Sequence, residues 1–248
     1  MPETTLAAAV DRLRRTKHVA VLTGAGMSAE SGIAPFRGKG GIWARYDPME
    51  YATAEALARD PGKVWRMLRE LGNEIAAAEP NAGHLALARL EASGRAIVDV
   101  VTQNVDGLHQ RAGSARVIEL HGSGRGLFCT SCGSRMAAAS LRLSIEDLPP
   151  RCRCGGLIRP DVVLFGEPLP GGAFEAARSA VETAGVLLVV GTSAEVAPAA
   201  WLPDLARAHG TWLVEVNPEQ TWLSGRADVV LRDAAAAILP ALVEGILG

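Results

Sequence analysis

Residues 18–29, HVAVLTGAGMSA, form an apolar run that ends in a glycine turn. The run from His18 to Thr23 predicts a buried strand, and Gly24, Gly26 and Ala29 then fit the pattern G-x-G-x-x-[GA]. Glycines at these places permit a tight turn and the close approach of a pyrophosphate, which the N–H groups of a following helix favour. The stretch predicts a doubly wound α/β fold with a dinucleotide site. A glycine turn without a ligand is the alternative.

Strand-like apolar runs alternate with amphipathic helical segments along the rest of the chain. The predicted helices span residues 6–15, 54–78 with a break at 60–62, 84–92, 173–183, 201–209 and 235–246. The predicted strands span residues 18–23, 96–102, 162–165, 186–190, 211–216 and 228–231. Strands joined by helices indicate a parallel, Rossmann-like sheet that is covered on both faces.

Two stretches interrupt this alternation and predict insertions. Residues 38–80 are expected to form a loop and a helical insertion after the first strand and turn. Residues 124–158 hold all four cysteines and are expected to form a small separate module. The main nucleotide-binding domain is then built from the three remaining segments, 1–37, 81–123 and 159–248.

The composition argues against several classes of partner. With 25 basic and 27 acidic residues, the formal net charge of −2 creates no strong field for nucleic acid or for an anionic membrane. The first residues lack the basic and apolar regions of a signal peptide, and no apolar run reaches the roughly 18–20 residues of a membrane span. We therefore expect a cytoplasmic protein that binds neither membrane nor nucleic acid directly.

The segment that follows the glycine turn disfavours a dehydrogenase. An ordinary dinucleotide site carries an acidic residue about 20 positions after the glycines, at the end of a second strand. Here that place is Tyr46-Asp47-Pro48-Met49-Glu50, which predicts a loop. Hydride transfer is therefore the least favoured activity.

The four cysteines form two close pairs. Cys129-x-x-Cys132 and Cys152-x-Cys154 are separated by 19 residues, a spacing that suits tetrahedral zinc. No histidine lies in this stretch, so four thiolates are the expected ligands of a closed, structural site. Four reduced cysteines without metal are the alternative.

The glycine turn continues as GAGMSAESGIAPFRG over residues 24–38, which resembles the first signature of the sirtuin family. Further matching motifs follow in order: Gly41-Ile42-Trp43, TQNVDGLH at 102–109, ELHG at 119–122, the cysteine pairs, Phe165-Gly166-Glu167, Gly191-Thr192-Ser193 and Val216-Asn217. The resemblance runs from about residue 18 to the last helix, although the second cysteine pair is C-x-C where the family usually has C-x-x-C. It implies an NAD-dependent protein-lysine deacylase of the bacterial type.

The resemblance implies that NAD is a co-substrate and that an acyl group, acetyl first, leaves a protein lysine. The products are nicotinamide, free lysine and O-acyl-ADP-ribose. Such chemistry needs a base that titrates near neutral pH, which favours histidine. His121 matches the general base of the family, and Asn104 is implied to contact the ribose and its waters.

The resemblance also assigns the cofactor contacts. Phe36 shields the reacting sugar carbon, Arg37 belongs to the same cofactor loop, and Asp106 holds the nicotinamide amide. Asn217 hydrogen-bonds the adenosine ribose, and Ala235 lies against the adenine. The other implied contacts are Gly24, Ala25, Gly26, Ser28, Ala29, Trp43, Gln103, Asn104, Val105, Gly191, Thr192 and Ser193. For Gln103, Asn104 and Asp106, loop capping by Asx turns is the alternative.

The acylated-lysine protein is expected to add as a strand between two backbone segments, 163–167 and 195–197. The residues expected to contact it are Val163, Phe165, Gly166, Glu195 and Val196. One branch of the family removes acidic acyl groups with a tyrosine and an arginine three residues apart, and Leu68 and Leu71 occupy those places here. Leucine cannot bind a carboxylate, so we expect neutral acyl groups. Core packing of both leucines is the alternative.

Two other functions remain open at this point. A mono-ADP-ribosyltransferase uses the same cofactor site but adds mass to a protein. A non-catalytic sensor of NAD or ADP-ribose binds without turnover, which the presence of His121, Asn104 and Asp106 disfavours.

Overall fold

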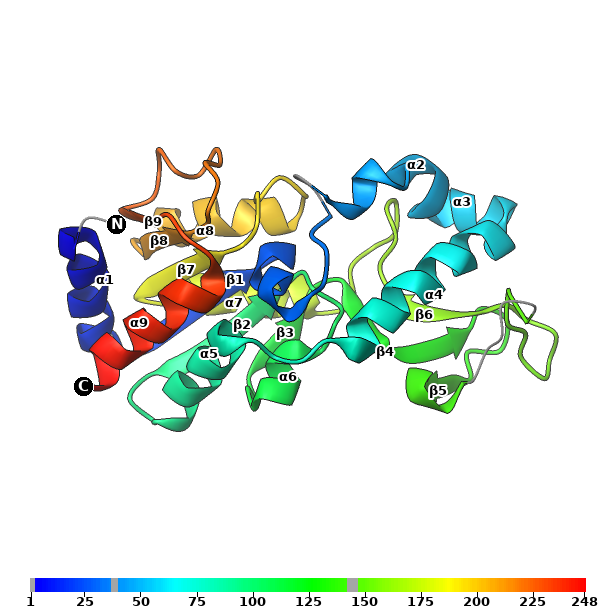
Figure 1. Ribbon diagram of the computed structural model, residues 1–248, viewed down its shortest axis with the longest axis horizontal. Coiled ribbons are helices and arrows are strands. Elements are labelled where there is room, and N and C mark those ends of the chain that lie inside the picture. The colour runs from blue at the N-terminus through cyan, green and yellow to red at the C-terminus, as the bar shows by residue number, and fades with distance from the viewer. Residues whose placement is uncertain (1–2, 37–39, 142–146) are drawn as a thin grey trace.

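The structure is a computed structural model that describes residues 3–36, 40–141 and 147–248 (Figure 1). Six parallel strands form the main sheet in the order β3-β2-β1-β7-β8-β9. Their bounds are β1 His18–Thr23, β2 Ile97–Thr102, β3 Val117–Glu119, β7 Val186–Val190, β8 Trp212–Val216 and β9 Val229–Leu231. The predicted doubly wound α/β class is confirmed.

Helices cover both faces of this sheet because the strand residues alternate between two apolar layers. The even-numbered side chains Ala20 and Leu22 of β1 pack against α7 (Ala173–Thr183) and α8 (Leu202–Ala208). The odd-numbered Val19 and Val21 pack against the other helices, α1 (Glu3–Arg15), α5 (Ala82–Ala92) and α9 (Ala235–Leu247). Strands buried on both faces read as continuous apolar runs, which is why the sequence predicted them well.

The order in which the chain adds strands to the sheet reverses at β1, with β2 on one side of it and β7 on the other. The chain runs from β1 to β2 and β3 on one side, and then from β7 to β8 and β9 on the other. Thr23 is level with Val190 of β7 and with Thr102 of β2, so the turns after these three strands meet at one edge. Such a switch point is the usual ligand site of an open α/β sheet.

The two insertions form a second lobe, on the right of Figure 1. The first insertion contributes α2 (Pro48–Tyr51), α3 (Ala54–Arg59) and α4 (Pro61–Ala77), and the second contributes the antiparallel sheet β5-β4-β6. The strands of that sheet are β4 (Gly122–Cys129), β5 (Arg135–Ala137) and β6 (Ile158–Val162). A single apolar cluster joins both insertions, with Val64 and Trp65 of α4 packed against Leu127 and Ile158.

Two predictions for this lobe are wrong. The stretch 46–50 is a loop only in part, because the Asp47 carboxylate accepts a hydrogen bond from the N–H of Met49 (2.8 Å) and begins the short helix α2. The strand was predicted at 162–165, but the strand in this region, β6, spans Ile158–Val162. It pairs antiparallel with β4 instead of joining the parallel sheet. The predicted break at 60–62 is confirmed by Asp60, which caps α4.

No helix in the described part of the chain is long and apolar enough to cross a bilayer.

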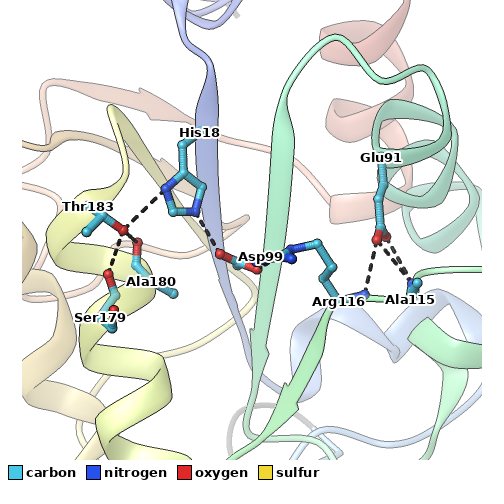
Figure 2. Close-up of polar contacts among 8 residues, drawn as sticks. All are labelled: His18, Glu91, Asp99, Ala115, Arg116, Ser179, Ala180 and Thr183. Carbon is cyan, nitrogen blue, oxygen red and sulfur yellow. Dashed lines mark hydrogen bonds and ion pairs between the residues drawn. The ribbon is translucent and has the colours of Figure 1, made fainter.

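A polar cluster ties the strands together at the edge opposite the switch point (Figure 2). The Asp99 carboxylate of β2 accepts hydrogen bonds from Nε2 of His18 and from Nε of Arg116, each at 2.7 Å. The other ring nitrogen of His18 lies 3.3 Å from the hydroxyl of Thr183 on α7, and Glu91 accepts from the backbone N–H of Arg116 (3.1 Å). Asp99 is 7% exposed and thus joins β1, β2 and the start of β3 from a buried position.

Replacing Asp99 by alanine should lower the free energy of unfolding by about 2 kcal/mol, because the change removes a buried carboxylate and leaves the partly buried His18 without its acceptor. The matched change Glu244→Ala removes an ion pair with Arg89 in which both side chains are more than half exposed, and should cost less than about 0.5 kcal/mol. Urea titrations of both variants measure the difference. Equal losses would show that the buried cluster is no stronger than a surface ion pair.

Candidate active site

A cleft of about 1270 Å³ opens at the switch point, between the main sheet and the smaller lobe. Most of the residues that the sequence singled out line it. They are Gly24, Ala25, Gly26, Ala29, Phe36, Trp43, Leu68, Leu71, Gln103, Asn104, Val105, His121, Val163, Phe165, Gly166, Gly191, Thr192, Ser193, Glu195, Val196 and Asn217.

The glycine turn after β1 packs directly against the turn after β7. The N–H of Gly26 donates to the carbonyl of Gly191 (2.8 Å), and a Cβ on Gly26 would lie 2.8 Å from the Cα of Gly191. Gly191 itself has a φ of +58°, and a Cβ there would lie 2.4 Å from the nitrogen of Met27. Glycine is therefore required on both sides of this contact.

The helix expected after the turn is absent as an α-helix. Residues Ala25–Met27 and Ala29–Ser31 form two short 3₁₀ turns instead. Any anion bound here therefore meets the N–H groups of tight turns and not the dipole of a long helix. The prediction of a helix N-terminus was wrong because Gly32, with a φ of +87°, ends the second turn after three residues.

Asn104 is held in place by a buried network. Its side-chain N–H groups donate to the carbonyl of Gly24 (3.0 Å) and to the hydroxyl of Ser28 (3.2 Å). The Ser28 hydroxyl donates in turn to Asp106 (2.7 Å), whose other oxygen accepts from the N–H of Leu108 (2.9 Å). Asn104 reaches the cleft, whereas Ser28 and Asp106 lie buried behind it. Through its hydrogen bond from Leu108, Asp106 caps the loop, which was the alternative predicted for this residue in place of a cofactor contact.

His121 stands between the sheet and the smaller lobe. Its Nδ1 lies 3.1 Å from the carbonyl of Gln103, which can only accept, so Nδ1 carries the proton and Nε2 carries the lone pair. Burial lowers the pKa of His121 below its ordinary value of 6.5, although the hydrogen bond to Gln103 opposes the shift. The imidazole is therefore neutral at pH 7 and can accept a proton at Nε2.

Two further histidines lie buried beneath the cleft. The rings of His84 and His109 have centroids 4.8 Å apart, and Nε2 of His109 lies 3.1 Å from the hydroxyl of Thr23. Burial lowers the pKa of His84 to about 4 and that of His109 to about 3. Both rings are neutral at pH 7, and they support the strand ends instead of lining the cleft.

Thr192 links the three strand ends on the other side of the cleft. Its hydroxyl accepts from the Gln103 amide (2.9 Å), and its carbonyl accepts from the Asn217 amide (3.2 Å). Ala235 does not reach the cleft: it is 3% exposed and belongs to the core under α9, while its neighbour Ala234 lines the cleft. Arg37 lies outside the described residues.

The sequence did not predict the loop 218–222, which also lines the cleft. This loop is anchored by Glu215, a carboxylate that is 1% exposed in β8. Glu215 accepts hydrogen bonds from the hydroxyls of Thr221 and Ser224 and lies 3.2 Å from Nη1 of Arg232. A charged residue in the apolar strand WLVEV was the one signal that could have revealed the loop.

The segments 163–167 and 195–197 face the same cleft, and we call them its two walls. The first wall is joined to His121, because the N–H of Val163 donates to the His121 carbonyl (2.9 Å). It is also fixed by Glu167, which accepts from Arg159 and from the N–H of Leu164 (2.9 Å each). Burial opposes ionisation of Glu167, but these hydrogen bonds lower its pKa overall.

An apolar end of the cleft lies against α4. Leu68 and Leu71 line it together with Met67, and no lysine or arginine is among the described residues that do so. Leu68 also packs against the shared cluster of the smaller lobe. Leu68 therefore also belongs to the core, as the alternative prediction stated, but both leucines line the cleft.

The four cysteines meet at the far end of the smaller lobe, and the predicted cluster is confirmed. All four sulfur atoms lie within 4.8 Å of one another, with Cys129 to Cys154 at 3.5 Å and Cys132 to Cys152 at 3.8 Å. Zinc–sulfur bonds of about 2.3 Å in a tetrahedron place sulfurs about 3.8 Å apart, so the set fits one zinc ion. None of these cysteines is among the described residues that line the cleft, which suits a structural ion.

The chain is similar throughout its length to known proteins. The model of the Sir2 family matches residues 24–198. An NAD-dependent protein deacylase 2 of Pyrobaculum aerophilum is 52% identical and covers 94% of this chain and 93% of its own length. An NAD-dependent protein deacylase of Mycobacterium tuberculosis is 50% identical over 91% of this chain and 96% of its own.

Solved structures agree with this likeness. A mutant Sir2 homologue in complex with ADP ribose has a TM-score of 0.92 and 43% identity, covering 100% of this chain and 97% of that one. A mutant Sir2 with a deacetylated p53 peptide and 3'-O-acetyl ADP ribose has a TM-score of 0.90 and 34% identity, covering 97% and 98%. The chain belongs to the Sir2 family, the sirtuins.

The buried histidine pair should make the protein sensitive to acid. Because burial lowers both pKa values below 6.5, the unfolded chain takes up protons that the folded chain does not. Stability should fall as the pH drops from 6.5 toward 4 for His84 and toward 3 for His109, by up to about 1.4 kcal/mol per pH unit for each.

Unfolding by urea at pH 6.5 and 4.5 tests this in variants His84→Gln and His109→Gln. Each should lose about 2 kcal/mol less than the unchanged protein between the two pH values. His209→Gln, at an exposed position, should keep the full loss. Parallel losses in all four proteins would contradict the assignment.

Proposed function

We propose that this chain removes acyl groups from protein lysine side chains in an NAD-dependent reaction, with His121 as the general base. The observation that carries this assignment is the position of His121. Its proton is fixed on Nδ1 by Gln103, and its backbone joins the wall that starts at Val163. One cleft thus contains a glycine turn suited to a dinucleotide, a neutral imidazole and two walls for a peptide.

NAD as co-substrate would supply the ADP-ribosyl group that accepts the acyl group; nicotinamide leaves, and one water molecule is consumed as the lysine amine is released. The turns at Gly24–Gly26 and Gly191 line the cleft, where their backbone can hold the phosphates. Asn104 presents an amide to the ribose in an orientation that Gly24 and Ser28 fix. His121 takes a ribose hydroxyl proton onto Nε2, which its lowered pKa keeps free at neutral pH.

Aromatic side chains keep water from the reacting sugar carbon. The rings of Phe36 and Trp43 stack with centroids 5.1 Å apart, and Trp43 lies 6.4 Å from Phe165 of the first wall. This row of rings covers the cleft between the cofactor turn and the peptide walls. Exclusion of water favours transfer of the acyl group to the sugar over hydrolysis of the activated sugar.

The acylated protein binds as an added strand between the two walls. Their backbone groups are the natural partners of an extended peptide, because strand addition uses main-chain hydrogen bonds. The acyl chain then points toward the apolar end of the cleft at Met67, Leu68 and Leu71. That end has no cation among the described lining residues, so it accepts acetyl and longer apolar groups and rejects carboxylates.

The deacylase activity is tested with an acetyl-lysine peptide and NAD, followed by mass spectrometry. We expect one nicotinamide and one acetyl-ADP-ribose for each acetyl group lost, and no loss without NAD. His121→Ala should reduce kcat by at least about 100-fold, the usual contribution of a general base. His209→Gln, on the exposed end of α8, is the matched histidine change that should retain activity.

Two other results would replace this assignment. Consumption of NAD with mass added to protein, while the peptide stays acetylated, would indicate a mono-ADP-ribosyltransferase. Binding of NAD without turnover would indicate a sensor.

The acyl preference is tested by comparing acetyl and succinyl peptides. We expect the unchanged protein to favour acetyl in kcat/KM by at least about tenfold, since a carboxylate would be buried without a partner. Leu71→Arg should raise the ratio of succinyl to acetyl activity by about tenfold, because a charge-assisted hydrogen bond becomes available.

The control is Leu85→Arg, which places the same charge at an exposed position of α5. It should leave the ratio unchanged. A succinyl activity above the acetyl activity in the unchanged protein would refute the neutral-acyl assignment.

A further inference from the structure

The exposed aromatic surface of this protein is concentrated in the cleft. The large apolar side chains with high exposure in the described residues are Phe36, Met49, Leu85, Ile97, Phe165, Trp201 and Trp222. All four aromatic members of this set line the cleft. Phe36 and Phe165 belong to the row of rings already described, and the indole N–H of Trp222 donates to the carbonyl of Ala194 (2.9 Å). Trp201 remains, and it is 56% exposed.

Trp201 is fixed to the second wall although its ring is exposed. The N–H of Ala200 donates to the carbonyl of Val196 (2.9 Å), and the N–H of Trp201 donates to that of Pro198 (3.0 Å). Ala199 and Leu202, on either side of Trp201, are buried in the core that α7 and α8 form with the sheet. The backbone therefore holds the indole at the cleft while the flanking side chains anchor the segment.

Phe174, which follows the first wall along the chain, contacts Trp201. It lies seven residues after Glu167, at the start of α7, and its ring packs partly against the core. The rings of Phe174 and Trp201 meet edge to face, with centroids 6.1 Å apart and an angle of 86° between their planes. Each wall is thus followed along the chain by one member of an aromatic pair that lines the cleft.

We propose that Trp201 and Phe174 form a subsite for a large apolar side chain of the protein substrate, aromatic before aliphatic, within three residues of the acyl-lysine. The proposal rests on the proposed function, because the same walls bind the peptide backbone. A peptide bound between the two walls would run close to the Phe174–Trp201 pair, because each wall is followed by one of these residues. The edge-to-face pair leaves much of the indole uncovered, and a third ring gains stacking and apolar burial there.

The charges around the pair disfavour an acidic residue at this position. Glu175, next to Phe174, is exposed and lines the cleft. No described lysine or arginine lines the cleft. An acidic side chain would therefore meet an apolar surface beside a like charge, which adds repulsion to the lack of apolar contact.

The test uses acetyl-lysine peptides that carry a single Trp, Leu, Ala or Glu at each position from three before to three after the lysine. At one position we expect kcat/KM for Trp to exceed that for Ala by about tenfold through KM, with Leu between them and Glu lowest. Trp201→Ala should bring the ratio of Trp to Ala close to one, and Trp201→Phe should restore part of it. Leu85→Ala removes an equally exposed side chain outside the cleft and should keep the full ratio.

Calorimetric binding of the same peptides without NAD separates this proposal from the proposed function. Tighter binding of the Trp peptide that depends on Trp201 would support the subsite even if no peptide were deacetylated. Deacetylation with no preference at any position, or a preference that survives in Trp201→Ala, would overturn the subsite and leave the deacylase assignment intact.

Discussion

The close contact between two glycine turns is the constraint on which the rest of the site depends. Gly26 and Gly191 touch through backbone atoms, and any side chain at either place would overlap the other turn. Because β1 and β7 are in register at Thr23 and Val190, this contact fixes the height at which both strands end. Gln103 and Asn217 then reach Thr192 from the neighbouring strands. The backbone of these two glycine turns therefore forms the floor of the cleft.

The main sheet could be predicted from the sequence because its strands are apolar on both faces and its helices have one apolar face. β1, α7 and β7 begin and end at the predicted residues. The small sheet could not be predicted in this way. β4 has glycine at alternate places in GSGRGLFC, with one serine and one arginine between them, so it shows neither an apolar run nor an apolar–polar alternation. Its pairing with β6 depends on contacts between residues 29 to 40 positions apart in the chain.

The candidate site could likewise be predicted from the sequence only in part. Motif residues at strand ends fall in the cleft because all parallel strands end at one edge. Ala235 shows the limit of this reasoning: a shift of one residue at the start of α9 turns its side chain into the core and leaves Ala234 at the cleft. The loop 218–222 is held by Glu215 from within a strand, and the pairing of that carboxylate with Ser224 and Arg232 follows only from the folded chain.

The smaller lobe has one core and not two. Leu68 of α4 and Cys152 of the cysteine cluster pack against the same apolar cluster. The cysteine cluster and the apolar end of the cleft therefore share one apolar core. A metal ion bound by the four cysteines would stabilise the packing behind α4, so its loss would loosen the helix that carries Leu68 and Leu71 at the cleft.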